Sequence, residues 1–128
     1  MRIEDFDHVA LRVSDVDRSI AWYTDVLGLE REQVPAWGDY PVVLKAGHAS
    51  VALFQAPRPD LPPPAEHSLR VTHIAFRLGR REFDEAREEL AAKGLDAEFQ
   101  DHEVCHSLYV RDPDGHQVEL TTYDVAGD

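Results

Sequence analysis

Two six-residue segments of the chain alternate polar and apolar positions in the same way. HVALRV occupies residues 8–13 and HIAFRL occupies residues 73–78, and each begins with a histidine. Successive side chains of a strand point to opposite faces, so the apolar residues of each segment share one face and the histidine, alanine and arginine share the other. The pattern therefore predicts one strand written twice, with a histidine in the same register in each copy.

Each predicted strand is followed by a segment of helical periodicity. In SDVDRSIAWYTDVLGL (14–29), Ser14 and Asp17 resemble an N-terminal capping box. The apolar side of this segment consists of Val16, Ile20, Tyr23 and Leu27. In GRREFDEAREELAAKGL (79–95), the corresponding side consists of Phe83, Ala86 and Leu90. A glycine followed by a leucine closes both segments, which is typical of a helix C-terminus.

Both halves end in short alternating segments joined by turns, YPVVLKAGHASVALFQ (40–55) and HSLYVRDPDGHQVELTTY (106–123). Between the halves, APRPDLPPPAEHS (56–68) holds five of the eight prolines and is typical of a stiff linker. The predicted fold class is α+β, with two tandem βαβββ modules in one domain. Module one spans residues 1–55, the linker 56–68 and module two 69–128.

Composition narrows the function classes. The 13 basic and 25 acidic residues give a formal net charge of −12, which repels phosphate backbones and disfavours a nucleic-acid partner. No apolar run has the length of a signal sequence or a membrane span, so we expect a cytoplasmic protein that does not bind membranes. Cys105 is the only cysteine, which excludes an internal disulfide.

The strongest candidate chemistry lies on the face that carries the repeated histidines. In the last strand, Val118 and Leu120 are predicted to face the core, which leaves Glu119 on the polar face. A solvated sheet face would explain one histidine, but His8 and His73 occupy equivalent positions in the two copies. Together with Glu119 they provide two imidazoles and a carboxylate, a set that suits a divalent transition metal with open coordination positions.

The segments DHVALRVSDVDRSIAWYTDVLGLE, THIAFRL and HSLYVRDPDGHQVELTTY resemble the vicinal oxygen chelate superfamily. This superfamily includes glyoxalase I, fosfomycin and bleomycin resistance proteins and extradiol dioxygenases, and the resemblance covers nearly the whole chain. It implies sheets curled around a cavity in which His8, His73 and Glu119 hold a metal. It also implies a homodimer with sites shared between subunits, and a small-molecule substrate.

Positions at which this sequence departs from the patterns of individual family members help to distinguish the possible reactions. The fourth metal ligand of glyoxalase I aligns with Ala52, and a threonine of fosfomycin thiol transferases aligns with Ala10, which disfavours both activities. The extradiol signature is matched by a set of residues in module two: His102, Tyr109, Asp112, Pro113, Gly115 and Glu119. Gln100 departs from the first position of that signature.

The resulting functional hypothesis is ring cleavage of a catechol-type substrate, with Fe(II) as the favoured metal and Mn(II), Ni(II) or Zn(II) as alternatives. Tyr109 would hydrogen-bond a substrate oxygen, and His102 would act as acid and base. Two alternatives stay open: a glyoxalase-like isomerase or thiol transferase, and a small-molecule binding protein of the bleomycin-resistance type. For the aromatic residues Trp37, Tyr40 and Phe54, pocket lining and plain packing are both open.

Overall fold

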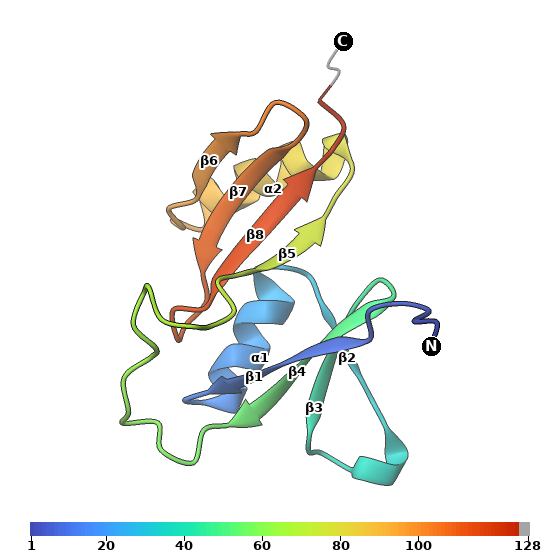
Figure 1. The fold of residues 1–128 in the computed structure, drawn as a ribbon, viewed down its shortest axis with the longest axis vertical. Helices are drawn as coiled ribbons and strands as arrows, with labels where there is room; N and C mark the ends of the chain where they lie inside the picture. Colours follow the sequence, from blue (N-terminus) through green and yellow to red (C-terminus); the bar gives the residue numbers. More distant parts are fainter. Residues whose placement is uncertain (126–128) are drawn as a thin grey trace. The chain divides into compact units, whose positions relative to one another are not determined.

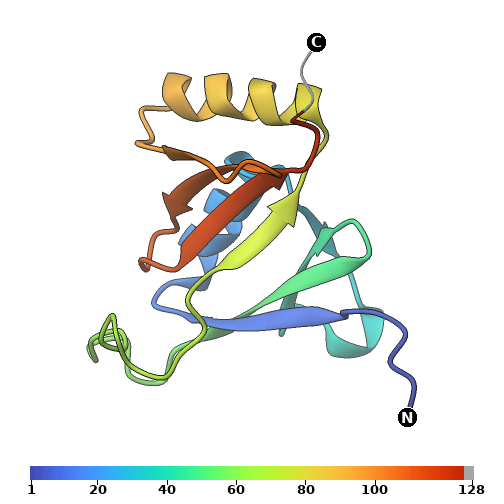
Figure 2. The ribbon, with the colours of Figure 1, turned by 45° about the horizontal axis from the view of Figure 1, so that its top comes forward.

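The computed structural model describes residues 1–125 and divides the chain into two compact units, which meet in sequence at Pro63 and Pro64 (Figures 1 and 2). This boundary lies inside the proline-rich segment predicted as a linker. No helix or strand occurs between Ala56 and His73. None of the helices in the described part of the chain is long and apolar enough to cross a membrane.

The first unit contains one helix and a four-stranded mixed sheet in the order β1-β4-β3-β2 (Figure 1). Its elements are β1 (His8–Val13), α1 (Val16–Asp25), β2 (Glu30–Glu32), the short 3-10 helix η1 (Pro35–Trp37), β3 (Val42–Ala46) and β4 (Ala49–Gln55). β1 runs parallel to β4, and the other pairings are antiparallel. Helix α1 packs on β3 and β4.

The second unit repeats this arrangement, with its sheet in the order β5-β8-β7-β6. Its elements are β5 (Ile74–Arg77), α2 (Arg80–Ala92), β6 (Glu98–Asp101), β7 (His106–Arg111) and β8 (Gln117–Thr122). β5 runs parallel to β8, and α2 packs on β8. The predicted α+β class with two βαβββ modules is therefore confirmed, although the strand predicted from His73 to Leu78 is shorter and starts after His73.

Each unit has its own apolar core between its helix and its sheet. The most deeply buried side chains of the first unit are Val13, Tyr23, Leu44, Val51 and Leu53, and those of the second are Phe83, Leu90, Leu108 and Val118. The alternation predicted for the first strand is present, because every second residue of β1 is more buried than its neighbours. The prediction of which helix faces are buried is confirmed in part. Their central aromatic residues are buried, whereas Val16, Ile20, Leu27 and Ala86 are half-buried.

The start of the first helix differs from the sequence prediction. Asp15, rather than Ser14, is the N-cap residue, because its backbone is extended (φ −146°, ψ 105°) and its carboxylate accepts the backbone N–H of Arg18. The Ser14 hydroxyl instead accepts a hydrogen bond from the Arg18 guanidinium at 2.7 Å. At the other end, Gly28 has a φ of +73°, the left-handed conformation in which glycine is favoured.

The polar face of β8 is not a solvated surface. Glu119 and Thr121 point away from the apolar core, yet they are only 9% and 7% exposed. The reason lies in strand order, since β8 is an interior strand whose neighbours β5 and β7 flank it on both sides. A carboxylate buried in this way needs hydrogen-bond partners.

Candidate functional site

Glu119 and His73 form the centre of the candidate site in the second unit. Oε1 of Glu119 lies 3.1 Å from Nε2 of His73. β5 and β8 bring the two residues together, because Ala75 of β5 pairs with Glu119 of β8 and His73 lies two positions earlier on the same face. The remaining ring nitrogen of His73, Nδ1, lies 2.9 Å from the hydroxyl of Thr72.

The second carboxylate oxygen of Glu119 has a different partner. The buried hydroxyl of Ser107 donates a hydrogen bond of 2.7 Å to Oε2. Thr121 lies beside this bond, with its Oγ1 at 3.3 Å from Ser107 Oγ, and donates its own proton to the carbonyl oxygen of His106. The two oxygens of Glu119 therefore face different directions, one toward Ser107 and one toward His73.

Tyr109 lies next to this pair and is linked to the second predicted catalytic residue. It pairs with Glu119 across β7 and β8, and its ring meets the His73 ring edge to face at 6.2 Å. Its hydroxyl lies 3.2 Å from Nε2 of His102. Burial, and next the negative charge of Glu119, raise the pKa of the Tyr109 hydroxyl above its ordinary value. Tyr109 is therefore a neutral hydrogen-bond donor at neutral pH.

His8 lies in the first unit, at the start of β1, and has a partner of its own. Oδ2 of Asp7 lies 2.7 Å from Nδ1 of His8. Because a carboxylate only accepts, Nδ1 carries the proton and Nε2 keeps its lone pair. In both modules the residue immediately before the histidine contacts Nδ1, but the two rings differ. Nε2 of His73 donates toward the Glu119 carboxylate, so Nδ1 of His73 accepts from the Thr72 hydroxyl.

The strand registers make the two modules comparable position by position. Ala10 pairs with Ala52 across the parallel strands β1 and β4, as Ala75 pairs with Glu119 across β5 and β8. His8 and His73 lie two residues before the first member of each pair. Ala52 therefore occupies the position equivalent to Glu119, and the repeat supplies two imidazoles but one carboxylate.

The structure brings together some of the predicted site residues in pairs. His73 and Glu119 form one pair and His102 and Tyr109 the other, both within the second unit, while His8 belongs to the first unit. Within neither unit do three His, Cys, Asp or Glu side chains of residues 1–125 gather into a metal-binding cluster. The set of His8, His73 and Glu119 therefore remains a prediction at this point.

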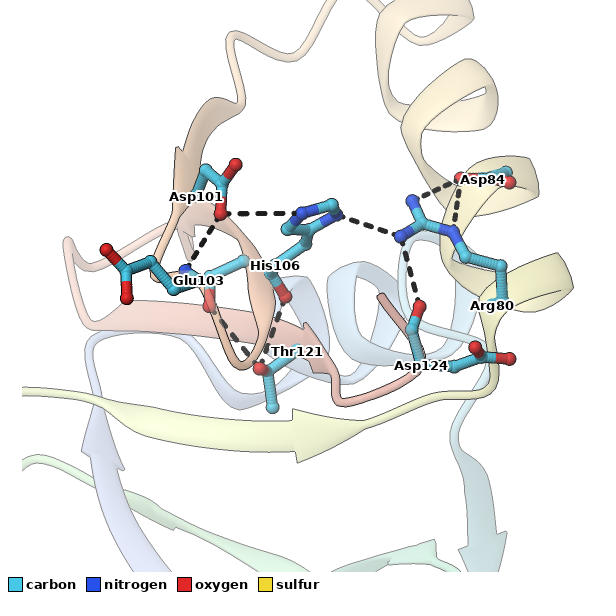
Figure 3. Close-up of polar contacts among 8 residues, drawn as sticks. Arg80, Asp84, Asp101, Glu103, His106, Thr121 and Asp124 are labelled. Carbon is cyan, nitrogen blue, oxygen red and sulfur yellow. Dashed lines mark hydrogen bonds and ion pairs between the residues drawn. The ribbon is translucent and has the colours of Figure 1, made fainter. Parts of the chain in front are cut away.

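His106, the first residue of β7, has a different environment from His102 (Figure 3). Its Nδ1 lies 2.9 Å from a guanidinium nitrogen of Arg80, and its Nε2 lies 3.5 Å from a carboxylate oxygen of Asp101. Arg80 is also bound to Asp84 and to the carbonyl oxygen of Asp124. Both ring nitrogens of His106 therefore have charged partners, and its environment differs from that of His102.

Sequence reasoning missed Ser107, Asp7 and Thr72. Strand alternation could have indicated Ser107, because it lies two residues before Tyr109 on the same face of β7. The repeat could have indicated the other two, because both precede a histidine at equivalent positions. Of the aromatic candidates, Tyr40 packs edge to face on Phe54 at 5.9 Å, while Trp37 and Tyr40 are about half exposed, at 51% and 49%.

Comparisons with known proteins identify the family of this chain. Residues 5–120 match the family described as Glyoxalase/Bleomycin resistance protein/Dioxygenase superfamily. The metallothiol transferase FosB of Staphylococcus epidermidis is 32% identical over 131 residues, which cover 95% of this chain and 84% of FosB. Biphenyl-2,3-diol 1,2-dioxygenase 3 of Rhodococcus globerulus is 33% identical over 118 residues, which cover 88% of this chain and 60% of the dioxygenase.

A solved structure extends the similarity to the level of the fold. The crystal structure of lactoylglutathione lyase from Agrobacterium tumefaciens superimposes with a TM-score of 0.69 and 25% sequence identity. The match covers 100% of both chains. The similar proteins thus include enzymes with three different reactions, and the side chains of the site have to distinguish among them.

Proposed function

Because this chain belongs to the glyoxalase/bleomycin resistance protein/dioxygenase superfamily, we propose that it is a divalent-metal-dependent enzyme that transfers a thiol to a small substrate rich in oxygen. The observation that supports a metal site is the distance of 3.1 Å between Nε2 of His73 and Oε1 of Glu119. The proposed reaction class follows the metallothiol transferase, since the match extends over 84% of that relative but over 60% of the dioxygenase.

The chemistry of the donor atoms fits a divalent metal. Nδ1 of both His8 and His73 is contacted by the preceding residue. Nε2 of His73 faces the Glu119 carboxylate, and a metal bound there would displace the proton between these two groups. Glu119 adds a buried carboxylate oxygen. In the proposed site these three side chains hold the metal, and the set of two imidazoles and one carboxylate accommodates Mn(II), Fe(II), Ni(II) or Zn(II).

A bound divalent ion supplies Lewis acidity, which polarises substrate oxygens. Tyr109 provides a neutral donor next to Glu119, suited to orient an oxygen of the substrate. In the proposed tautomer, Nε2–H of His102 donates to the Tyr109 oxygen at 3.2 Å, which leaves the Tyr109 proton for the substrate, and Nδ1 of His102 is the base that accepts the thiol proton. In the overall reaction a sulfur–carbon bond forms, a carbon–oxygen bond of an epoxide breaks, and the thiol proton ends on the released oxygen.

A small epoxide, the functional group of fosfomycin, is the probe substrate for this proposal, although fosfomycin itself is disfavoured. The family resemblance places a threonine at the position of Ala10 in fosfomycin thiol transferases, and alanine offers no hydroxyl there. A site that lacks a hydrogen-bonding group loses the discrimination built on it. Fosfomycin is therefore expected to be a poor substrate.

Ring cleavage of a catechol is the second candidate, and the contact between His102 and Tyr109 favours it. In this reaction Tyr109 would hydrogen-bond the deprotonating catechol oxygen, and His102 would deliver and accept protons. The two candidates differ in what they consume. Thiol transfer consumes the thiol, and ring cleavage consumes dioxygen.

The test begins with the metal. Elemental analysis of the anaerobically purified protein is expected to find one divalent metal per chain, lost in His73→Ala and Glu119→Ala and retained in the control His48→Ala. His48 is an exposed histidine in a turn of the first unit, outside the proposed ligand set. Equal metal content in all four proteins would contradict the site.

The reaction is tested next on the metal-loaded protein. Glutathione and cysteine are mixed with epoxides that bear a carboxylate or a phosphonate, fosfomycin included, and the loss of free thiol is followed. Oxygen uptake is followed in parallel with catechols. Thiol loss without oxygen uptake supports the transferase, and oxygen uptake with catechols alone would replace it by ring cleavage.

A further inference from the structure

Ser107 is a second residue with a direct contact to the candidate ligand Glu119. Its side chain is completely buried, and its hydroxyl donates a hydrogen bond of 2.7 Å to Oε2 of Glu119. This contact joins β7 and β8, and the backbone partner of Ser107 in β8 is Thr121 rather than Glu119. The hydroxyl thus reaches diagonally across the strand pair to the carboxylate.

The surrounding hydrogen bonds fix the direction in which Ser107 donates. Thr121 gives its own proton to the carbonyl oxygen of His106 and approaches Ser107 Oγ at 3.3 Å. A serine hydroxyl has one proton, and the shorter contact is the one to Glu119. Hydrogen bonds to a charged acceptor are also stronger than those between neutral groups, so the proton of Ser107 belongs to Oε2.

This bond leaves the carboxylate with one oxygen in use and one directed at His73. Oε1 is the oxygen that faces His73 Nε2 at 3.1 Å. A carboxylate that is 9% exposed, in an interior strand, has few alternative orientations once one oxygen is tied to the strand beside it. Ser107 therefore ties Oε2 and leaves Oε1 to be presented, beside the Tyr109 hydroxyl, which also interacts with this carboxylate.

We propose that Ser107 is a positioning residue that makes Glu119 a one-oxygen ligand of the metal, binding through Oε1. This inference rests on the metal site of the proposed function and adds the residue that sets its carboxylate. Partners behind metal ligands commonly contribute a factor of about 10 to 100 in metal affinity. Without the Ser107 hydroxyl, the Glu119 carboxylate can turn. It would then bind the metal through both oxygens, or through one oxygen that has no fixed position.

The experiment compares the binding of Mn(II) to apo forms of the full chain by calorimetry. Ser107→Ala is expected to weaken binding about tenfold, and Ser107→Thr, which keeps the hydroxyl, is expected to restore most of the affinity. Leu90→Val is the control for a general loss of stability, because Leu90 is a buried residue of α2 in the core of the same unit. Its affinity for Mn(II) should equal that of the unaltered protein.

A spectroscopic measurement separates positioning from packing. The electron paramagnetic resonance spectrum of bound Mn(II) depends on the ligand set, so it should change in Ser107→Ala and remain unchanged in Leu90→Val. Tight Mn(II) binding by the unaltered protein, with the same affinity and spectrum in Ser107→Ala, would overturn the role of Ser107 and leave the proposed function standing. No Mn(II) binding by the unaltered protein would overturn both.

Discussion

Asp7 holds His8 by its Nδ1, with the carboxylate oxygen at 2.7 Å from the ring nitrogen. The contact fixes the tautomer that leaves Nε2 unprotonated, although Asp7 itself is 94% exposed. A carboxylate behind a ligand histidine also makes the imidazole more basic. In the proposed site Asp7 therefore acts through His8, as Ser107 acts through Glu119.

Replacing Asp7 with asparagine tests this relationship. Asp7→Asn is expected to weaken metal binding by a factor of about ten or less, because the contact is exposed to solvent. Binding of Mn(II) is measured by calorimetry. Asp5→Asn is the matched control, since the Asp5 carboxylate accepts the backbone N–H of Phe6 instead of a histidine. An equal loss in both variants would assign the effect to net charge.

His102 and Tyr109 are expected to affect turnover and to spare the metal. His102→Gln should lower kcat by about 10² to 10⁴, the usual contribution of a general acid or base. Tyr109→Phe should lower kcat by about ten- to a hundredfold through the loss of one hydrogen bond in the transition state. Both are measured in the thiol-loss assay, beside elemental analysis. Loss of metal from either variant would move that residue into the ligand set.

Ser19 offers a prediction about stability. It is fully buried in α1, and its hydroxyl has no hydrogen-bond partner among the described residues. Ser19→Ala removes an unsatisfied polar group and improves helix propensity, so the free energy of unfolding should rise by about 0.5 kcal/mol. Ser107→Ala removes a hydrogen bond to a charged acceptor and should lower the free energy of unfolding by about 1–3 kcal/mol. Urea unfolding of both variants gives the comparison, and a loss of stability in Ser19→Ala would contradict it.

The contact between Arg80 and Asp84 predicts a dependence of stability on acid pH (Figure 3). The hydrogen bond from Arg80 lowers the pKa of Asp84 below its ordinary value of 3.8. Because the folded state then binds this proton less readily than the unfolded state, the contact stabilises the fold above that value and is lost as the pH falls through the lowered pKa. Asp84→Asn should therefore reduce Tm by about 1–2 °C at pH 7, and the difference should disappear as the pH falls below the lowered pKa of Asp84.

The matched control for this prediction lies one residue further along the same helix. Glu85 pairs with Arg81 at 3.0 Å with the same spacing, but Arg81 is 85% exposed where Arg80 is 27% exposed. Glu85→Gln should change Tm less than Asp84→Asn at neutral pH, because exposed pairs contribute little. Scanning calorimetry across the pH range measures both. A pH-independent difference between Asp84→Asn and the unaltered protein would contradict the argument.

The repeat was readable from the sequence because strand and helix periods are local properties. Alternation in residues 8–13 and helical spacing in residues 79–95 follow from chemistry a few residues apart, and the structure has both elements. The N-cap was misassigned because Ser14 and Asp15 both carry capping side chains. The choice between them depended on the backbone conformation at the end of β1.

For the candidate site, the sequence by itself determined which residue types occupy equivalent positions of the two modules. It indicated His8, His73 and Glu119 on the polar face of their strands. These three positions follow from counting along strands, since the side-chain period of two is fixed by the backbone. Ala52 stood out only through the resemblance to glyoxalase I, whose fourth ligand aligns there.

Tertiary structure alone decided the partners of those side chains. The burial of Glu119 results from the interior place of β8, and its bond to Ser107 results from the register of β7 against β8. Likewise, the distinction between His102 and His106 arose only when α2 placed Arg80 against His106. Strand order and helix packing join residues far apart in the chain, and no local pattern encodes which of them will meet.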